Sequence, residues 1–315
     1  MNKLLLIDGN SLTYRAYYGS AYGSQGILKT KNGTPINAVI TLNRMLKNAF
    51  KQYNPTHVLI AFDAGPKTIR HKKLESYKGG RQKTPDELIV QFPIIKEMIK
   101  KMGIIQYELN EIEADDIIAS LAVKYSRDNE VIVMSSDKDL YQLVDNNISI
   151  AVPQNGSKPN DFVFINNFEE RFGYCPNQVK DIKGIVGDPS DNLPGVKGIG
   201  IKGAIKLLDK YKTIEGIYEN INDISGLIKE KLIESKEMAF LCKDIATLFF
   251  DIEIPFSLEE MTYKNEISNE LLGFFEKYEL NSLLRSHNHT TKKLEKEQKS
   301  LEKDIKQLSF DNLLF

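Results

Sequence analysis

Three short, unbroken apolar runs constrain the fold of this chain more than any other feature. They span Leu4–Ile7, Val58–Phe62 and Val131–Met134, and none of them alternates with polar residues. Runs of this kind are typical of parallel strands covered by helices on both faces. The intervals between them carry helical periodicity, which predicts an α/β domain with crossover helices. The helical patterns cover residues 38–53, 86–102 and 114–125.

Composition excludes several classes of protein. Among 315 residues, 41% are apolar and 27% are charged, the balance of a globular protein with a core. The 42 Lys and Arg against 43 Asp and Glu give a net charge of −1, so the whole chain is not a uniformly basic nucleic-acid binder. No apolar run approaches the ~20 residues that cross a bilayer, and the first run ends at Asp8, too early for a signal peptide. We therefore expect a soluble, cytoplasmic protein of roughly two domains, with no membrane partner.

The strand signal fades past about residue 175, where short helical patterns alternate with Gly, Pro and Asn. We expect an α/β domain over 1–174, a smaller helical domain over 175–288 and a Lys/Glu-rich tail over 289–315. The tail is predicted to be a solvated helix or a disordered extension. The only cysteines, Cys175 and Cys242, form no C-x-x-C pair, and there are four histidines. Any metal is therefore expected to be bound by oxygen ligands.

Acidic residues follow each of the three apolar runs, and this placement carries most of the chemical information. The carboxyl ends of parallel strands meet at one edge of a sheet, which is where ligands bind. One further acidic group opens the helix at 114–125, and another lies in a turn-rich loop near the domain boundary. The nine carboxylates are Asp8, Asp63, Glu113, Asp115, Asp116, Asp137, Asp139, Asp188 and Asp191.

So many carboxylates in one place would repel each other, and divalent cations would supply the missing positive charge. A ligand set made only of oxygens selects Mg²⁺ or Mn²⁺. Two such ions about 3.5–4 Å apart activate water in phosphoryl displacement. The alternative for any single acid is a helix cap or a turn. Helix capping and turn formation, however, do not require acidic residues at the ends of three strands at once.

Two segments are locally basic although the whole chain is neutral. Residues 66–83 contain seven Lys and Arg against one acid, together with Tyr77, whose ring could stack on an unpaired base. Lys78 and Arg81 are three residues apart, so they would share one helical face and could contact a scissile phosphate. The alternative is a plain basic helix. Residues 196–212 contain five Lys against one acid.

Gly198-Ile-Gly200-Ile-Lys-Gly203 matches the dinucleotide-binding pattern G-x-G-x-x-G, but no strand precedes it, so that interpretation fails. A hairpin between two helices fits better. Its glycines would let backbone N–H groups approach a DNA phosphate, and nearby lysines would neutralise charge without reading sequence. The alternative is a Gly-rich helix connection with solvated lysines. The lysines concerned are Lys197, Lys202 and Lys206.

Seven motifs occur in an order that resembles a known family. The sequence is similar to the 5′-3′ exonuclease domain of bacterial DNA polymerase I, a branch of the flap endonuclease family, from residue 1 to about 286. No polymerase-like sequence follows, so the resemblance implies a stand-alone 5′ nuclease. The motifs are Leu-Ile-Asp8-Gly-Asn-Ser-Leu-Thr-Tyr-Arg15-Ala, Ala-Phe-Asp63, Lys67-Thr-Ile-Arg70, Tyr77-Lys78-Gly-Gly-Arg81, Glu113-Ala-Asp115-Asp116, Ser136-Asp137-Lys-Asp139-Leu and Gly187-Asp188-Pro-Ser-Asp191-Asn-Leu-Pro-Gly-Val.

The resemblance implies a PIN-like parallel-sheet core, a helical arch at about 66–92 and a helix-three-turn-helix module for duplex DNA. It implies a first metal at Asp8, Asp63, Glu113, Asp115 and Asp116, and a second at Asp137, Asp139, Asp188 and Asp191. Lys78, Arg81 and Asp116 would act in catalysis, with Arg15, Arg70 and Tyr77 placing the substrate. Lys197, Gly198, Gly200, Lys202 and Lys206 would bind duplex DNA. In this family the hairpin at Gly195–Gly200 can also bind K⁺.

Two positions depart from the family pattern. Gly203 stands where Thr is common, which would weaken one phosphate contact. Gln82 follows Arg81, where relatives often have a base. Neither departure affects the carboxylates.

We therefore expect a Mg²⁺-dependent 5′-3′ exonuclease and 5′-flap endonuclease acting on DNA and RNA primer remnants in replication and repair, with Mn²⁺ able to substitute. A PIN-type ribonuclease and a non-enzymatic protein that binds DNA structures are the alternatives. The apolar C-terminus at 307–315 loosely resembles peptides that dock on the sliding clamp. An unrelated tail packing on its own core or on another partner is the alternative for that segment.

Overall fold

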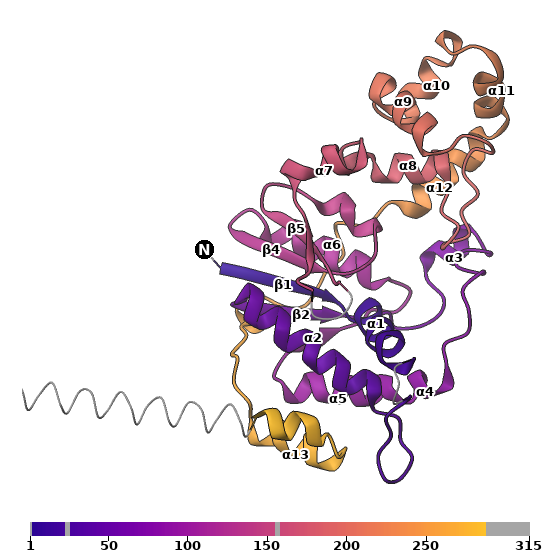
Figure 1. The fold of residues 1–315 in the computed structure, drawn as a ribbon. Helices are drawn as coiled ribbons and strands as arrows, with labels where there is room; N and C mark the ends of the chain where they lie inside the picture. Colours follow the sequence, from indigo (N-terminus) through magenta and orange to yellow (C-terminus); the bar gives the residue numbers. More distant parts are fainter. Residues whose placement is uncertain (1, 23–25, 155–157, 288–315) are drawn as a thin grey trace, which may run out of the picture.

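A computed structural model describes residues 2–22, 26–154 and 158–287 of the chain. Figure 1 shows an α/β core with a group of helices at one end and a separate helix, α13, at the other. The expected tail at 289–315, with its clamp-like segment at 307–315, lies outside the described residues.

The core is a six-stranded sheet in the order β3-β2-β1-β4-β5-β6. All neighbouring strands are parallel except β5 and β6, which are antiparallel. The three predicted strands are confirmed as β1, β2 and β4, at the centre of the sheet. The other strands, β3 at one edge and β5 and β6 towards the other, had no clear signal in the sequence. The strands are β1 (Asn2–Asp8), β2 (His57–Ala61), β3 (Ile105–Tyr107), β4 (Asn129–Met134), β5 (Ile148–Val152) and β6 (Asp161–Val163).

Helices cover both faces of this sheet, as expected for buried parallel strands. Leu5 and Ile7 of β1 pack towards α1, α2, α5 and α13. Leu4 and Leu6 pack towards α6 and the short 3-10 helix η1 on the other face. The helices of the core are α1 (Gly9–Ala21), α2 (Asn37–Tyr53), α3 (Ile69–Lys73), α4 (Asp86–Ile89), α5 (Gln91–Lys101), α6 (Ala114–Tyr125), α7 (Ile165–Phe172) and η1 (Asp139–Leu143), with α13 (Asn269–Lys277) returning to it.

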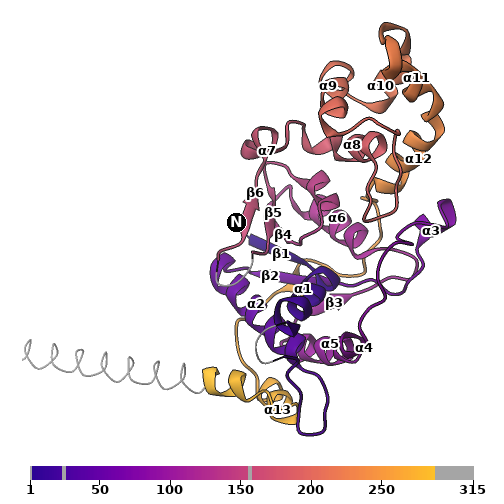
Figure 2. The same cartoon turned by 45° about the vertical axis from the view of Figure 1, so that its right-hand side comes forward.

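A smaller helical unit with its own apolar core follows the sheet. It lies at the end of the molecule opposite α13 (Figure 2). Its helices are α8 (Val179–Val186), α9 (Ile201–Tyr211), α10 (Ile214–Glu219), α11 (Gly226–Glu234) and α12 (Lys236–Ala246). The 3-10 turns of the chain beyond residue 175 are η2 (Pro176–Gln178), η3 (Ile221–Asp223) and η4 (Glu259–Met261).

The segment at 66–92 differs from the expected helical arch. It holds only α3, α4 and the start of α5, and residues 75–80 between the first two form turns. Lys78 has a φ of +57°, which an α-helix cannot accommodate. The prediction that Lys78 and Arg81 share a helical face is therefore wrong. Instead, a backbone bond from Lys78 N to Asp191 O (3.0 Å) ties this segment to the loop after α8.

Candidate active site

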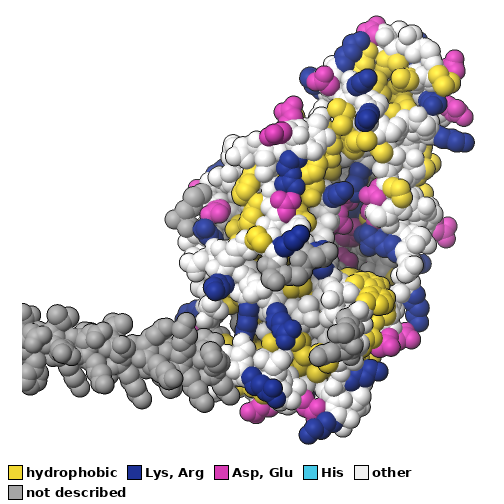
Figure 3. All heavy atoms as spheres, viewed as in Figure 1, with side chains coloured by type: hydrophobic (Ala, Val, Ile, Leu, Met, Phe, Trp, Pro, Cys, Tyr) yellow, Lys and Arg dark blue, Asp and Glu magenta, His cyan; other side chains and the backbone are white. Residues whose placement is uncertain are grey.

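The carboxyl edge of the parallel strands opens into a cavity of about 1060 Å³. The acidic side chains in the hollow are visible in Figure 3. The cavity is lined by acids from strand ends far apart in the sequence, and by Lys78 and Arg81 from the segment above. The acids that line it are Asp8, Asp63, Glu113, Asp115 and Asp137.

Asp8 ends β1 and caps α1 at the same time. Its Oδ1 accepts from Ser11 N (2.9 Å), and its Oδ2 accepts from Ser135 Oγ (2.7 Å). Gly9 follows because a Cβ there would lie 2.5 Å from the Phe62 ring, so only glycine lets α1 start this close to β2. Burial, with the charges of Asp63 and Asp137, raises the pKa of Asp8 to about 7 despite these hydrogen bonds.

The pKa values of two neighbouring carboxyls, Asp63 and Asp115, are raised as well. Burial and the charges of Asp137 and Asp8 raise the pKa of Asp115 well above its usual value. Burial also raises the pKa of Asp63, although Ala114 N donates to its Oδ1 at 2.8 Å and Asn10 Nδ2 to its Oδ2 at 2.9 Å. Partly buried acids whose pKa values are raised by neighbouring acids form a set of donors whose repulsion a divalent cation would relieve.

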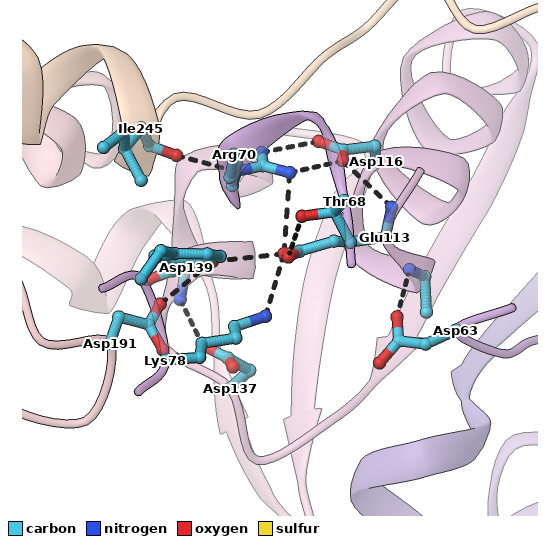
Figure 4. Close-up of polar contacts among 12 residues, drawn as sticks. Asp63, Thr68, Arg70, Lys78, Glu113, Asp116, Asp137, Asp139, Asp191 and Ile245 are labelled. Carbon is cyan, nitrogen blue, oxygen red and sulfur yellow. Dashed lines mark hydrogen bonds and ion pairs between the residues drawn. The ribbon is translucent and has the colours of Figure 1, made fainter. Parts of the chain in front are cut away.

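Glu113 is the acid that already has cationic partners. It caps α6, and its Oε2 lies 2.9 Å from Lys78 Nζ and 3.5 Å from Arg70 Nη1. Burial alone would raise the pKa of Glu113, but the charges of Lys78 and Arg70 hold it below its usual range. Thr68 Oγ1 donates to the other oxygen at 3.1 Å. Figure 4 shows how these groups converge on Glu113, with Asp63 to one side.

Asp116 is fully buried and faces Arg70 rather than the cavity. The guanidinium binds both of its oxygens and also donates to the carbonyls of Ile245 (2.7 Å) and Thr247 (3.0 Å). Phe249 N donates to Asp116 Oδ1 at 3.0 Å. Asp116 thus connects α6 with the chain that leaves α12.

The acids assigned to a second metal lie beside the first group but are held by other cations. Lys183 of α8 pairs with Asp139 and with Asp188 Oδ2, the latter at 2.6 Å. Burial alone would raise the pKa of Asp188, but Lys183 holds it at about 2. Arg81 Nη2 lies 2.8 Å from Asp191 Oδ1. Asp137 also forms a turn, because its Oδ1 accepts from Asp139 N at 2.9 Å.

Five of the nine predicted acids therefore line the cavity, while Asp116 lies behind it on Arg70. The remaining three, Asp139, Asp188 and Asp191, are held beside it by Lys183 and Arg81. Several of these acids also act as the helix caps and turn formers that were the alternative. Within residues 2–22, 26–154 and 158–287, no group of three or more acidic, His or Cys side chains is arranged so that it could hold a metal ion as it stands. The donor set nevertheless fits hard divalent ions, because it is made of carboxylate oxygens in a charge-deficient cavity. Asp8, Asp63 and Asp115, whose pKa values are all raised, would gain most from such an ion.

Arg15 and Tyr77 differ in how open they are to a substrate. Arg15 is on α1, and its Nη1 lies 3.4 Å from Ser136 Oγ at the cavity rim. Tyr77 is 3% exposed, and its hydroxyl lies 3.2 Å from Glu113 Oε2 and 3.3 Å from Asp191 Oδ2. In this structure the Tyr77 ring therefore supports the carboxylates and is not open to a base.

The glycine hairpin lies between α8 and α9, with no strand before it. Gly187 and Gly195 have φ of +80° and +61°, and a Cβ on Gly195 would lie 2.3 Å from Gly187 N, so the two backbones need this contact. Lys231 Nζ of α11 donates to the Gly198 carbonyl at 3.1 Å. That carbonyl already has a cationic partner, and K⁺ binding stays a prediction. The exposed residues are Lys197, Gly198, Gly200, Lys202 and Lys206.

Sequence reasoning missed several supporting residues. Lys183 and Lys231 belong to no motif that was singled out, and only the folded chain brings them to the acids and to the hairpin. Ser135 directly follows β4, and Asn10 lies two residues after Asp8 inside the first motif. These positions were the available signals for their hydrogen bonds to Asp8 and Asp63.

Two family models together cover most of the chain. Residues 3–173 match the 5′-3′ exonuclease N-terminal resolvase-like domain, and residues 174–269 match the 5′-3′ exonuclease C-terminal SAM fold. The chain therefore belongs to the 5′-3′ exonuclease family.

The curated relatives are DNA polymerases I. That of Bacillus subtilis is 40% identical over 298 residues, covering 94% of this chain and 33% of its own length. That of Bacillus caldotenax is 37% identical over 310 residues, covering 98% and 34%. The chain spans about a third of the length of these relatives.

Solved structures share the fold at low identity. The bacteriophage T5 5′-exonuclease with bound zinc matches with a TM-score of 0.63 at 21% identity, over 78% of this chain and 89% of that one. The catalytic core of Rad2 with a DNA substrate matches with a TM-score of 0.57 at 15% identity, over 88% of each chain.

No helix within residues 2–22, 26–154 and 158–287 is both long and apolar enough to cross a bilayer.

Proposed function

We propose that this chain is a divalent-metal-dependent 5′ nuclease that hydrolyses DNA phosphodiesters at 5′ ends and at 5′ flaps. One observation carries the proposal. Acids from the ends of β1, β2 and β4 and from the start of α6 line a single cavity, and Lys78 and Arg81 line it too. The relatives named DNA polymerase I and the flap endonuclease of bacteriophage T5, solved with DNA and metal ions, support it.

The bound metal, Mg²⁺ with Mn²⁺ as a substitute, would lower the pKa of water and stabilise the leaving oxygen. Asp8, Asp63 and Asp115 would hold a first ion with Glu113, and Asp137, Asp139, Asp188 and Asp191 would hold a second. Asp116 would act through its position at the start of α6.

The other residues of the site bind and orient the DNA. Lys78 and Arg81 exchange their carboxylate partners for the scissile phosphate, and Arg15 binds the strand at the rim. Arg70 and Tyr77 keep the acids in place. The hairpin lysines hold the duplex through its phosphates, independently of sequence. The products are a 5′-phosphate and a 3′-hydroxyl.

In the cell, such an activity would remove flaps and RNA primer remnants during replication and repair in the cytoplasm. Docking on the sliding clamp through residues 307–315 would recruit it there. Deleting 288–315 and measuring capture by the immobilised clamp tests the docking. Equal capture of both forms would contradict it.

The substrate test compares a 5′-flap duplex, a flapless duplex and single-stranded RNA, each 5′-labelled, in Mg²⁺. We expect cleavage of the flap near its junction and much slower cleavage of the RNA. Preferential cleavage of the RNA would instead favour a PIN-type ribonuclease. Tight flap binding without cleavage of any substrate would favour a non-enzymatic DNA-binding protein.

A further inference from the structure

His71 of α3 lines the cavity, and none of the roles proposed above uses it. The start of its own helix holds the ring, because Thr68 N donates to His71 Nδ1 at 3.1 Å. Tyr77 also meets the imidazole edge-on, with ring centroids 5.2 Å apart at an interplanar angle of 75°. The half-buried ring therefore has a fixed place in the cavity wall.

The bond from Thr68 determines which nitrogen of the His71 ring carries the hydrogen. A backbone N–H can only donate, so Nδ1 must accept and has no hydrogen of its own. The neutral imidazole then carries its hydrogen on Nε2, which is a donor. Among the residues that the structure describes, none accepts a hydrogen bond from Nε2. The described part of the chain thus offers this N–H to the cavity without supplying its acceptor.

The cations around His71, by contrast, are already paired. The three cationic side chains of α3 each form an ion pair with an acid. Lys78 and Arg81, the cations of the proposed catalytic group, also lie against carboxylates, so a phosphate must first displace those acids. His71 Nε2 needs no such exchange. It is a preorganised donor, which binds an anion with little cost of reorganisation.

A neutral N–H donor among carboxylates suits a phosphate oxygen of the DNA backbone. Hydrogen bonds to an ionised acceptor are the stronger ones, and contacts with phosphates fix the register of a bound strand. A neutral ring also adds no positive charge that would repel a divalent ion from the acids. Lys78, Arg81 and the metal are already assigned to the scissile phosphate. A neighbouring phosphate of the same strand is therefore the one that His71 can take.

We propose that His71 Nε2 donates a hydrogen bond to a non-bridging oxygen of a phosphate next to the scissile one, on the strand that is cut. This inference rests on the proposed nuclease function, because that function brings the strand into the cavity. The contact holds the strand in register for cleavage. No proton leaves the His71 ring in this role.

Two variants of the full chain separate the two nitrogens of the ring. In His71→Asn the amide oxygen takes the place of Nδ1 and still accepts from Thr68 N, but nothing replaces the hydrogen on Nε2. In His71→Gln the amide nitrogen takes the place of Nε2, whereas the acceptor for Thr68 N is lost. Single-turnover cleavage of a 5′-labelled flap duplex in Mg²⁺ is measured for both, together with the urea midpoint of unfolding.

We expect His71→Asn to keep the unfolding midpoint and to cleave about 10–100-fold more slowly, the effect of losing one hydrogen bond to a charged group. His71→Gln should unfold at a lower urea concentration, because it loses a helix cap, and should cleave much faster than His71→Asn. A histidine that only caps α3 predicts the opposite order of rates. That order, or equal rates in the two variants, would overturn the inference.

A change in the substrate gives a second readout. Methylphosphonates replace, one at a time, the phosphates on the two sides of the scissile one and remove the charged oxygen that accepts from Nε2. At one of these positions the wild type should lose rate, and His71→Asn should lose clearly less. Equal losses in both proteins at both positions would contradict the contact. The nuclease proposal fails differently, as no cleavage of the unmodified flap by the wild type in Mg²⁺.

Discussion

Arg70 and Asp116 form a two-point ion pair, with 2.6 Å from Nη1 to Oδ2 and 2.8 Å from Nη2 to Oδ1. Both side chains are buried, and the same guanidinium also binds the backbone that leaves α12. The pair therefore joins three parts of the molecule: the base of the 66–92 segment, the acidic start of α6 and the exit of the helical unit. We infer that it sets the position of the carboxylates relative to the helical unit that contains α8 to α12.

Replacing Arg70 with Ala should destabilise the fold by about 3–5 kcal/mol, because it leaves the charge of Asp116 buried and unpaired. Urea denaturation measures this loss. Lys83→Ala is the matched control, since Lys83 pairs with Asp86 on the surface of the same segment, and it should leave the midpoint in place. A loss below about 1 kcal/mol for Arg70→Ala would show that the ion pair does not hold these parts together.

Lys78→Ala should lower turnover by about 10²–10³-fold while changing flap affinity much less, because its contact with phosphate strengthens in the transition state. Single-turnover cleavage and binding in EDTA separate the two effects. Lys83→Ala again serves as the control. If kcat and affinity fell by the same factor, Lys78 would be an ordinary binding residue.

Much of the fold could be predicted from the sequence, since β1, β2 and β4 are central strands with continuous apolar runs. The edge strand β3 could not, because Ile105, Gln106 and Tyr107 are all only half buried and give no periodic signal. The turns at 75–80 were also missed, since the spacing of Lys78 and Arg81 suits a helix equally well. The positive φ of Lys78 and the bond from Lys78 N to Asp191 O, which exclude a helix, appear only in the folded chain.

The residues of the candidate site also fall into those that the sequence could predict and those that it could not. Most of the acids could be predicted because they follow a strand or open a helix, so topology brings them together, whereas Asp188 and Asp191 lie in the loop after α8 and were predicted from its turn-rich sequence. Their cationic partners could not. Lys183 reaches Asp139 and Asp188 from a helix in the second family domain, and no sequence pattern encodes that approach.

Lys183→Met should lower thermal stability without metal, because Asp139 and Asp188 lose the cation that holds them together. Added Mg²⁺ should then raise the melting temperature more in this variant than in the wild type, since bound metal supplies the missing charge and stabilises the folded state. Differential scanning calorimetry with and without Mg²⁺ measures both shifts. An equal shift in the two proteins would argue against a second metal at these acids.

Replacing Lys197, Lys202 and Lys206 together with Ala should weaken duplex binding uniformly across sequences. The slope of log K against log salt should fall by about 2–3, close to one for each phosphate that a lysine no longer neutralises. Binding titrations at salt concentrations from about 50 to about 200 mM measure this slope, because the affinity changes steeply over that range. Lys210→Ala, an exposed lysine at the far end of α9, is the control. An unchanged slope in the triple variant would remove the hairpin from the duplex interface.

The central claim is that the gathered carboxylates hold divalent ions that drive hydrolysis at 5′ ends. Its most direct test follows a 5′-labelled flap duplex with the wild type and with Asp63→Asn, first in Mg²⁺ and then in EDTA. We expect junction cleavage by the wild type in Mg²⁺, none in EDTA, recovery when Mg²⁺ is restored, and no recovery in the variant. Full activity in EDTA, or of Asp63→Asn at saturating Mg²⁺, would contradict the claim.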